Sequence, residues 1–302
     1  MLSRDRQGKG VDQAYRLRQW VSQGGPRGDG PRRPAQVVAV VSGKGGVGKT
    51  LIAANMSIAL AARGHRVILF DMDMGLANAD IVMGVEAGCT WRDVLSGRRS
   101  LDEIIVQGPG QVSLVPGASG VAHMANLSEF ERHQLMAAMR HIEDRWDVVV
   151  LDCGAGISQN VVGPTAGADT ILVVTTPEPT AVTDAYAMIK AFAQDQAGSG
   201  RSGGSIGVLV NLADSRREGR DAFERLAEVA ARFLHLPVTD YGYVLRDDHV
   251  PASIRQRCPV VLCYPRCAAS TCVMASAARL SREMGQPETG RSLFYRVMNM
   301  FL

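Results

Sequence analysis

The nonapeptide SGKGGVGKT at residues 42–50 constrains the fold of this 302-residue chain more than any other segment. It follows an apolar run, VVAVV, and precedes LIAANMSIALAA, which has the composition of a buried helix. Glycines allow backbone N–H groups to curl around phosphate oxygens, and the N-terminus of a helix adds partial positive charge. The pattern G-x-x-x-x-G-K-[ST] therefore predicts a phosphate-binding loop between a strand and a helix, formed by Gly43, Lys44, Gly45, Gly46, Val47, Gly48, Lys49, Thr50 and Leu51.

Two side chains of this loop have the chemistry that a nucleoside triphosphate requires. We expect the Lys49 ammonium to reach the β- and γ-phosphates, and the Thr50 hydroxyl to ligate Mg²⁺. The loop therefore predicts a nucleotide site that uses Mg²⁺ as its cofactor.

Carboxylates follow two further apolar runs. Asp71 ends VILFD and Asp73 lies just beyond it, whereas Asp152 ends WDVVVLD at 146–152. A carboxylate at the tip of such a strand can hold Mg²⁺, directly or through water, or can orient a water molecule for attack on the γ-phosphate. We therefore expect Asp71 and Asp152, together with Thr50, at the metal, and Asp73 beside the attacking water.

The body of the chain alternates apolar runs with helical patterns. Such alternation, with runs that are apolar on both faces, predicts an α/β fold with a mostly parallel central sheet and helices on both of its faces. Ligands of such folds bind at the carboxyl ends of the strands. The expected strands are 36–41, 67–71, 112–115, 148–152, 170–175, 206–211 and one near 260–262, and the expected helices are 50–63, 128–143, 181–197 and 221–233.

Composition divides the chain into four zones. Residues 1–21 contain a short helix-like stretch, 22–35 form a flexible linker rich in Gly, Pro and Arg, 36–286 form a single α/β domain, and 287–302 form an amphipathic segment. Eight Lys or Arg and three Asp give the first 35 residues a net charge of +5, so the remainder carries −2 of the total of +3. A near-neutral body argues against a nucleic-acid surface, and we expect no specific nucleic-acid partner.

Several classes of protein are excluded by what the sequence lacks. It has no uninterrupted apolar run of 18 residues, and its first residues, MLSRDRQGKG, contain no apolar core of a secretory signal. Its six cysteines are too few for a disulfide scaffold of this length. We therefore expect a cytoplasmic protein.

A second lysine in the loop, Lys44, is not needed for binding the chain's own nucleotide. With it, KGGVGKT resembles the deviant Walker A motif of the MinD/ParA family of ATPases. The resemblance implies ATP hydrolysis and an ATP-dependent homodimer in which Lys44 reaches the partner's phosphates. It makes Asp73 the residue that positions the attacking water and places Asp71 near the γ-phosphate, so that the expected catalytic residues are Lys44, Lys49, Asp71 and Asp73.

The resemblance also bears on the base that is bound. The sequence contains no N-K-x-D motif, which is usual in related GTPases, and the run IGVLV ends instead at Asn211. In the family, an asparagine at this position reads the edge of adenine. ATP is therefore the expected nucleotide, with Asn211 as a binding residue.

The N-terminal zone resembles one branch of the family. DQAYRLR at 12–18 is similar to the DQAxxLR signature of the FlhG (FleN, YlxH) flagellar-number regulators, and TTPEPTAVTDAYAMIK at 175–190 is similar to the same branch. The resemblance implies that an N-terminal helix stimulates FlhF, a GTPase of the signal-recognition-particle type, and it adds flagellar switch (C-ring) proteins as candidate partners. The residues expected to contact FlhF are Asp12, Gln13, Ala14, Leu17 and Arg18.

The last segment, RSLFYRVMNMFL at 291–302, places its apolar residues on one broad face when it is wound as a helix. It resembles the membrane-targeting helix of the same family. The resemblance implies peripheral attachment to anionic lipid at the inner face of the cell membrane, with a cell pole as a candidate position. The expected membrane contacts are Leu293, Phe294, Val297, Met298, Phe301 and Leu302.

The resulting hypothesis is an ATP-dependent, dimerising and membrane-associating switch that regulates flagellar number or placement. A MinD-type regulator of the division site shares the ATPase and the tail, and a ParA-type DNA-partition ATPase shares the P-loop. A carrier of a metal cluster is the third alternative, for which the C-x4-C-x3-C-x4-C spacing is poor. We expect these four cysteines to be mostly small buried side chains; they are Cys258, Cys263, Cys267 and Cys272.

Overall fold

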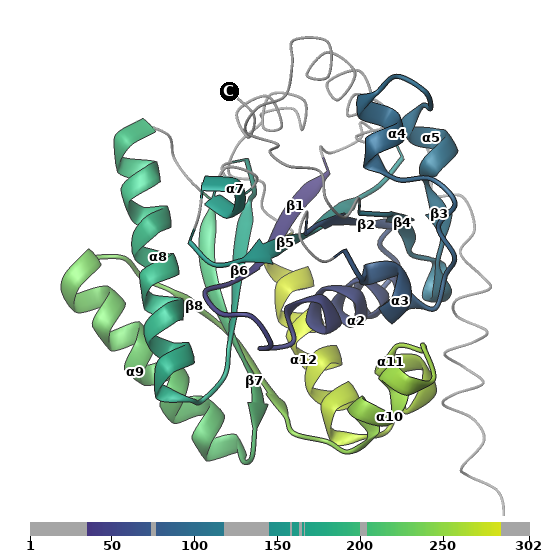
Figure 1. Ribbon diagram of the computed structural model, residues 1–302. Helices are drawn as coiled ribbons and strands as arrows, with labels where there is room; N and C mark the ends of the chain where they lie inside the picture. The colour runs from purple at the N-terminus through teal and green to yellow at the C-terminus, as the bar shows by residue number, and fades with distance from the viewer. Residues whose placement is uncertain are drawn as a thin grey trace, which may run out of the picture.

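The computed structural model describes residues 35–73, 77–117, 145–157, 159–162, 165, 167–199 and 204–284. These residues form a single α/β domain around an eight-stranded sheet with the strand order β3-β4-β2-β5-β1-β6-β7-β8 (Figure 1). The strands are β1 (Gln36–Ser42), β2 (Val67–Met72), β3 (Val106–Gln107), β4 (Ser113–Val115), β5 (Val148–Ala155), β6 (Thr170–Thr175), β7 (Ser205–Ala213) and β8 (Thr239–Leu245).

The sheet is parallel except at one edge, where β3 pairs antiparallel with β4. The first strand, β1, lies between β5 and β6, so the chain builds the sheet outward on both sides of it. Such a switch in strand order leaves a crevice at the carboxyl ends of the central strands. The phosphate-binding loop leaves β1 at this crevice.

The central strands are buried on both faces, as a parallel sheet requires. Along β1, Val37, Ala39 and Val41 belong to the hydrophobic core on one face. Val38 and Val40 belong to the core on the other. The alternation follows from the two-residue period of a strand, and it explains why these runs contain so few polar residues.

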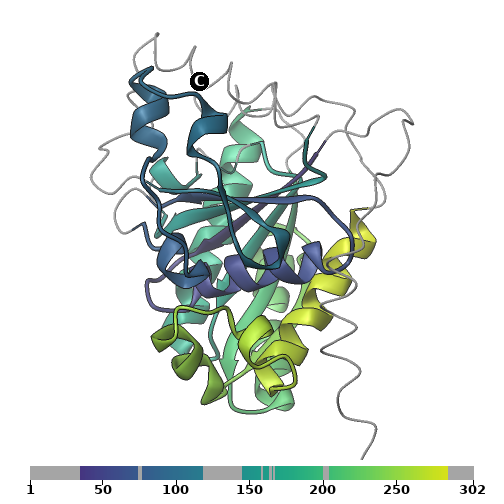
Figure 2. The same cartoon turned by 90° about the vertical axis from the view of Figure 1, so that its right-hand side faces the viewer.

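Two layers of helices cover the two faces (Figures 1 and 2). One core is completed by side chains from α2 (Lys49–Ala61), α3 (Ala79–Met83), α11 (Val260–Cys263) and α12 (Ala268–Glu283). The other is completed by α4 (Trp91–Leu95), α5 (Leu101–Ile104), α7 (Gln159–Val162), α8 (Pro179–Ser199) and α9 (Arg216–Leu234). The short elements η1 (Pro109–Gln111) and α10 (His249–Arg255) complete the described structure.

Six of the seven expected strands are confirmed as β1, β2, β4, β5, β6 and β7. The strand expected near 260–262 is wrong, because these residues belong to the helix α11. A short apolar run does not distinguish a buried strand from a single buried helical turn, and Pro259 at its start suits a helix N-terminus.

Two edge strands, β3 and β8, were not expected from the sequence, and β8 is the longer of the two. Its sequence, TDYGYVL, has only two fully buried residues and contains Gly242, so it lacks the apolar pattern of the central strands. Of the expected helices, 50–63, 181–197 and 221–233 are confirmed as α2, α8 and α9, and α9 begins five residues earlier than expected, after Ser215, whose side chain accepts a hydrogen bond from Glu218 N.

Four predictions lie outside the described residues, so the structure does not test them. They are the N-terminal helix at 1–21, the linker up to residue 34, the helix at 128–143 and the C-terminal amphipathic segment. Within the described ranges, no helix is both long enough and apolar enough to cross a bilayer.

Candidate functional site

The phosphate-binding loop joins β1 to α2 in a conformation that only glycines adopt easily. Gly46 and Gly48 have φ angles of 81° and 86°, in the left-handed region. A Cβ atom on Gly48 would lie 2.4 Å from Nδ2 of Asn211, and one on Gly43 would lie 2.2 Å from the carbonyl oxygen of Asp184. Residues of β7 and α8 therefore press against the loop, and both positions exclude a side chain.

Lys49 and Asp152 form a buried ion pair at the centre of the site. Lys49 Nζ lies 2.5 Å from Asp152 Oδ1, and the two side chains are 6% and 0% exposed. The pair connects the first residue of α2 with the carboxyl-terminal half of β5, although 103 positions separate them in the sequence. A buried carboxylate is stable here because the lysine compensates its charge.

The oxygens around this pair suit a magnesium ion. The second carboxylate oxygen of Asp152, Oδ2, is buried and makes no hydrogen bond within the described structure. The Thr50 hydroxyl lies 3.5 Å from Lys49 Nζ, beside the carboxylate. Carboxylate and hydroxyl oxygens are the donors that Mg²⁺ prefers in nucleotide sites. The residues present therefore fit the expected ion, and Thr50 and Asp152 would hold it.

Asp71 is buried and its carboxylate is bound to the backbone that follows it. It pairs in register with Asp152 on the neighbouring strand. Its oxygens accept hydrogen bonds from the backbone N–H groups of Asp73 at 3.0 Å, Asn78 at 2.9 Å and Ala79 at 3.0 Å. Burial and the nearby charge of Asp152 raise the pKa of Asp71 to about 7, although these amides favour the ionised form. In this structure Asp71 organises the β2–α3 connection, and its expected place near the metal and the γ-phosphate remains a prediction.

Asp73 lies at the start of this connection, close to the end of β5. Its Oδ1 would be 3.9 Å from a Cβ atom built on Gly154. The side chain therefore lies beside the last residues of β5, where a γ-phosphate and its attacking water are expected. Its role as the water-positioning residue remains a prediction.

Lys44 lies apart from the buried ion pair. Its Nζ is 3.3 Å from Glu178 Oε2 and 3.3 Å from Thr180 Oγ1, at the N-terminal end of α8. The side chains of Lys44 and Glu178 are 43% and 66% exposed. Sequence reasoning missed Glu178 and Thr180 as partners of the loop, because only the packing of α8 against it brings them close.

Asn211, near the end of β7, supports the loop from beneath. Its Nδ2 donates a hydrogen bond to the Val47 carbonyl oxygen at 2.8 Å, and the residue is only 6% exposed. This contact accounts for the exclusion of a side chain at Gly48. The expected contact of Asn211 with adenine remains a prediction.

The cysteines differ in their environments. Cys258 and Cys263 are joined by a disulfide bond, so they are not the isolated small side chains that the sequence suggested. Cys267 and Cys272 are free thiols of intermediate burial. Cys153, which follows Asp152, is fully buried, and burial raises the pKa of its thiol to about 12, which makes it a poor nucleophile.

Comparison with protein families and curated proteins agrees with this geometry. A family described as an AAA domain matches residues 35–198. The chain is 40% identical over 251 residues to the antiactivator FleN of Pseudomonas aeruginosa, covering 83% of this chain and 88% of FleN. It is 35% identical over 193 residues to the flagellum site-determining protein YlxH of Helicobacter pylori, covering 64% of this chain and 63% of YlxH.

The septum site-determining protein MinD of Bacillus subtilis is 37% identical over 166 residues, covering 53% of this chain and 60% of MinD. Among solved structures, the MinC:MinD cell division complex of Aquifex aeolicus has a TM-score of 0.65 at 26% identity, covering 84% of this chain and 98% of that one. MinD of Pyrococcus horikoshii, solved with Mg-ADP, has a TM-score of 0.66 at 23% identity, covering 83% and 98%. The last similarity shows the fold alone.

Proposed function

Because the chain belongs to the MinD/ParA family of P-loop ATPases, and within it to the branch of FleN and YlxH, we propose that it is an ATP-dependent switch that regulates flagellar number or placement. The similarity to FleN supports this function over a MinD-type role at the division site. It extends over 83% of the chain, whereas the similarity to the Bacillus subtilis MinD extends over 53%.

The described site supports ATP hydrolysis as follows. Lys49 exchanges Asp152 for the β- and γ-phosphate oxygens when the nucleotide enters, so that one buried cation always has an anionic partner. Asp152 and Thr50, with Asp71 nearby, would hold Mg²⁺, and the ion would neutralise phosphate charge when bound. Asp73 orients the water that attacks the γ-phosphate. Its backbone N–H donates a hydrogen bond to Asp71, which positions the main chain from which its side chain extends.

The observation that supports an ATP-dependent switch is that the two lysines of the phosphate-binding loop lie in different environments. Lys49 is buried against Asp152, whereas Lys44 is 43% exposed and lies on the surface of the same loop. A lysine so placed is available to the phosphates of a second subunit. ATP would therefore join two chains into a homodimer, and hydrolysis would separate them.

Dimerisation gives a physical route to membrane attachment. Ordering the 12-residue tail costs about 1–2 kcal/mol per residue, and its large apolar side chains return about 1.5–3 kcal/mol each when they are buried. The balance for one tail is therefore close to zero. Two tails on one dimer bind together through their effective concentration, so that attachment to anionic lipid follows the nucleotide state.

Stimulation of an FlhF-type GTPase tests the flagellar branch. The full-length protein should accelerate GTP hydrolysis by FlhF, and Gln13→Ala should remove most of this acceleration while leaving its own ATPase intact. Equal acceleration by the variant and the parent protein would reject the role of the N-terminal helix.

Two further measurements test the switch itself. Lys44→Ala should weaken the ATP-dependent dimer in sedimentation experiments while nucleotide binding is retained, and an unchanged dimer would exclude its action on the partner subunit. Deletion of residues 291–302 should release the ATP-bound protein from vesicles that contain anionic lipid. Undiminished vesicle binding would show that another surface makes the attachment.

A further inference from the structure

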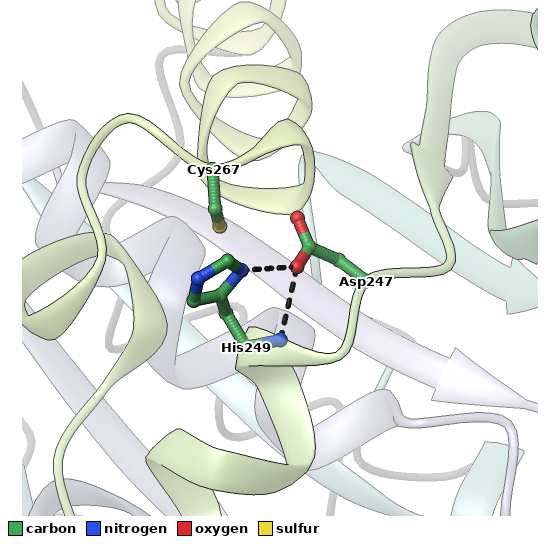
Figure 3. A group of neighbouring side chains, drawn as sticks. All are labelled: Asp247, His249 and Cys267. Carbon is green, nitrogen blue, oxygen red and sulfur yellow. Dashed lines mark hydrogen bonds and ion pairs between the residues drawn. The ribbon is translucent and has the colours of Figure 1, made fainter.

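Three potential metal ligands meet at the edge of the sheet that carries β8, outside the P-loop site (Figure 3). Asp247 lies in the connection after β8, His249 is the first residue of α10, and Cys267 is the N-cap of α12. One donor atom from each side chain lies within 4.8 Å of the other two. The fold brings together a carboxylate, an imidazole and a thiol that are spread over 21 positions of the sequence.

The carboxylate is held in place before any ion binds. The side chain of Asp247 is only 8% exposed. Its Oδ1 lies 2.8 Å from His249 Nδ1 and accepts a hydrogen bond from His249 N at 3.0 Å. Its Oδ2 accepts from Ala269 N at 3.1 Å, which connects the loop to the first turn of α12. The position of this ligand is therefore fixed from two sides.

The other two donors are also restrained. The imidazole of His249 packs against the ring of Tyr264 with 4.6 Å between the ring centroids. The sulfur of Cys267 accepts a hydrogen bond from Ser270 N at 3.4 Å and lies 3.3 Å from Ser270 Oγ. His249 is 54% exposed, so the cluster is open to solvent on one side. Ordering the ligands in advance lowers the entropic cost of binding an ion.

We propose that Asp247, His249 and Cys267 form a binding site for one divalent transition-metal ion of the zinc type, with water as a fourth ligand. A set of one sulfur, one nitrogen and one oxygen donor suits Zn²⁺, which accepts all three, whereas Mg²⁺ requires oxygen. On binding, the Cys267 thiol gives its proton to solvent and its thiolate joins the ion, and His249 binds as the neutral imidazole.

The position of the site suggests what the ion stabilises. It would tie the connection after β8 to the first turn of α12, and α12 packs against α2, which begins at the P-loop. Binding of the ion to the folded state alone raises the midpoint of thermal unfolding in proportion to the logarithm of its concentration. This site is separate from the magnesium site, because none of its ligands belongs to the P-loop or to the ends of β2 and β5.

The test uses the full-length protein, reduced, stripped of metal with a chelator, and kept in excess Mg²⁺ so that the P-loop carboxylates do not compete. Zn²⁺ is titrated by calorimetry, and Co²⁺ is titrated by absorption, where a thiolate ligand gives a charge-transfer band. We expect one ion of either kind per chain, and the charge-transfer band with Co²⁺.

Matched variants separate ligands from bystanders. Cys267→Ser keeps a good N-cap for α12 and should retain the fold by circular dichroism. It should lose the charge-transfer band and weaken Zn²⁺ binding by at least about 100-fold. Loss of a residue that only hydrogen-bonds to a ligand weakens metal binding by about 10- to 100-fold, so a larger loss indicates direct coordination. His249→Ala should weaken binding to a similar extent. Cys272→Ser, on the same helix, should bind like the parent protein.

Three outcomes would overturn the proposal. The first is the absence of stoichiometric binding of Zn²⁺ and Co²⁺, in which case Asp247 serves only to cap α12 and to hold the His249 ring. The second is binding that both Cys267→Ser and His249→Ala leave unchanged. The third is binding that is lost in Cys258→Ser/Cys263→Ser but kept in Cys267→Ser, which would assign the ion to the other two thiols of this segment.

Discussion

The two lysines of the phosphate-binding loop lie five residues apart and have opposite environments. Lys49, the first residue of α2, lies at the buried end of the site, where it meets Asp152 with both side chains almost inaccessible to water. Lys44 belongs to an exposed rim, where it meets Glu178 and Thr180 at the N-terminal end of α8. The same residue type therefore has two energetic roles within one loop.

The difference follows from solvent. A charge in the buried end is strongly coupled to its partner, because removing one member leaves the other desolvated and alone. An exposed ion pair contributes little, because water and salt screen it and two long side chains lose entropy in forming it. Lys49 therefore stays within the chain's own nucleotide site, whereas Lys44 can exchange Glu178 for another anionic partner at little cost in free energy.

The largest expected effect is that of Lys49→Ala. It should abolish tight ATP binding and lower the free energy of unfolding by about 3–5 kcal/mol, because Asp152 is left buried without a counter-charge. Calorimetric titration with ATP and urea denaturation measure the two effects. Lys44→Ala is the matched control and should change stability by less than about 1 kcal/mol. Equal destabilisation by the two variants would contradict the comparison.

The next effect concerns Asp71, the buried carboxyl group beside Asp152, and the pH dependence of the free energy of unfolding. The pKa of Asp71 is raised to about 7 in the folded state, above its ordinary value, so the folded protein binds more protons than the unfolded chain between these two values. The stability due to Asp71 is present below the ordinary pKa and is lost as the pH rises through 7. The total change is on the order of 4 kcal/mol.

Denaturation of the parent protein and of Asp71→Asn between pH 4 and pH 8 measures this contribution. The free energy of unfolding of the parent should fall more steeply with rising pH than that of the variant. Parallel pH profiles would show that Asp71 does not titrate in this range.

A smaller effect is expected for Asp73→Ala. Loss of a residue that orients the attacking water should slow ATP hydrolysis by about 100-fold, equivalent to about 2.7 kcal/mol. ATP binding and the ATP-dependent dimer should be retained, because the side chain is not part of the Lys49–Asp152 pair. Single-turnover hydrolysis measures the rate, and a rate equal to that of the parent would reject this role.

The smallest effect is expected at the rim. Glu178→Gln removes the partner that holds Lys44 in the monomer, and it should strengthen the ATP-dependent dimer about two- to fivefold at low salt. The gain should disappear at high salt. In the Lys44→Ala background the same substitution should have no effect on sedimentation, since no lysine is left to release. A gain that persists there would locate the effect outside this ion pair.

Much of the core of the site could be predicted from sequence. The P-loop residues are contiguous, and their glycines are required by local backbone conformation at Gly46 and Gly48. Asp71 and Asp152 follow apolar runs that are visible along the chain, and the parallel pairing of β2 and β5 then places the two carboxylates side by side. Local patterns of this kind are readable because they repeat with the period of a strand.

Other features of the site were not predictable. Glu178 reaches Lys44 from 134 positions away, and Asn211 reaches Val47 from 164 positions away. The edge strand β8 is too polar for its pattern to be recognised, and the apolar residues 260–262 turn out to be helical. The cluster of Asp247, His249 and Cys267 has no spacing of a known metal motif, so sequence alone suggested only its cysteine.

The sequence by itself determined the P-loop, the alternation of strands and helices, and hence a parallel α/β fold that binds nucleotide at the ends of its strands. Only the tertiary structure decided that Lys49 is buried against Asp152 while Lys44 stays at the surface, and that three dispersed ligands meet beside β8. The physical reason is range. Backbone conformation and periodicity depend on neighbours within a few residues, whereas burial and side-chain partners depend on the order of strands in the sheet, which no local pattern contains.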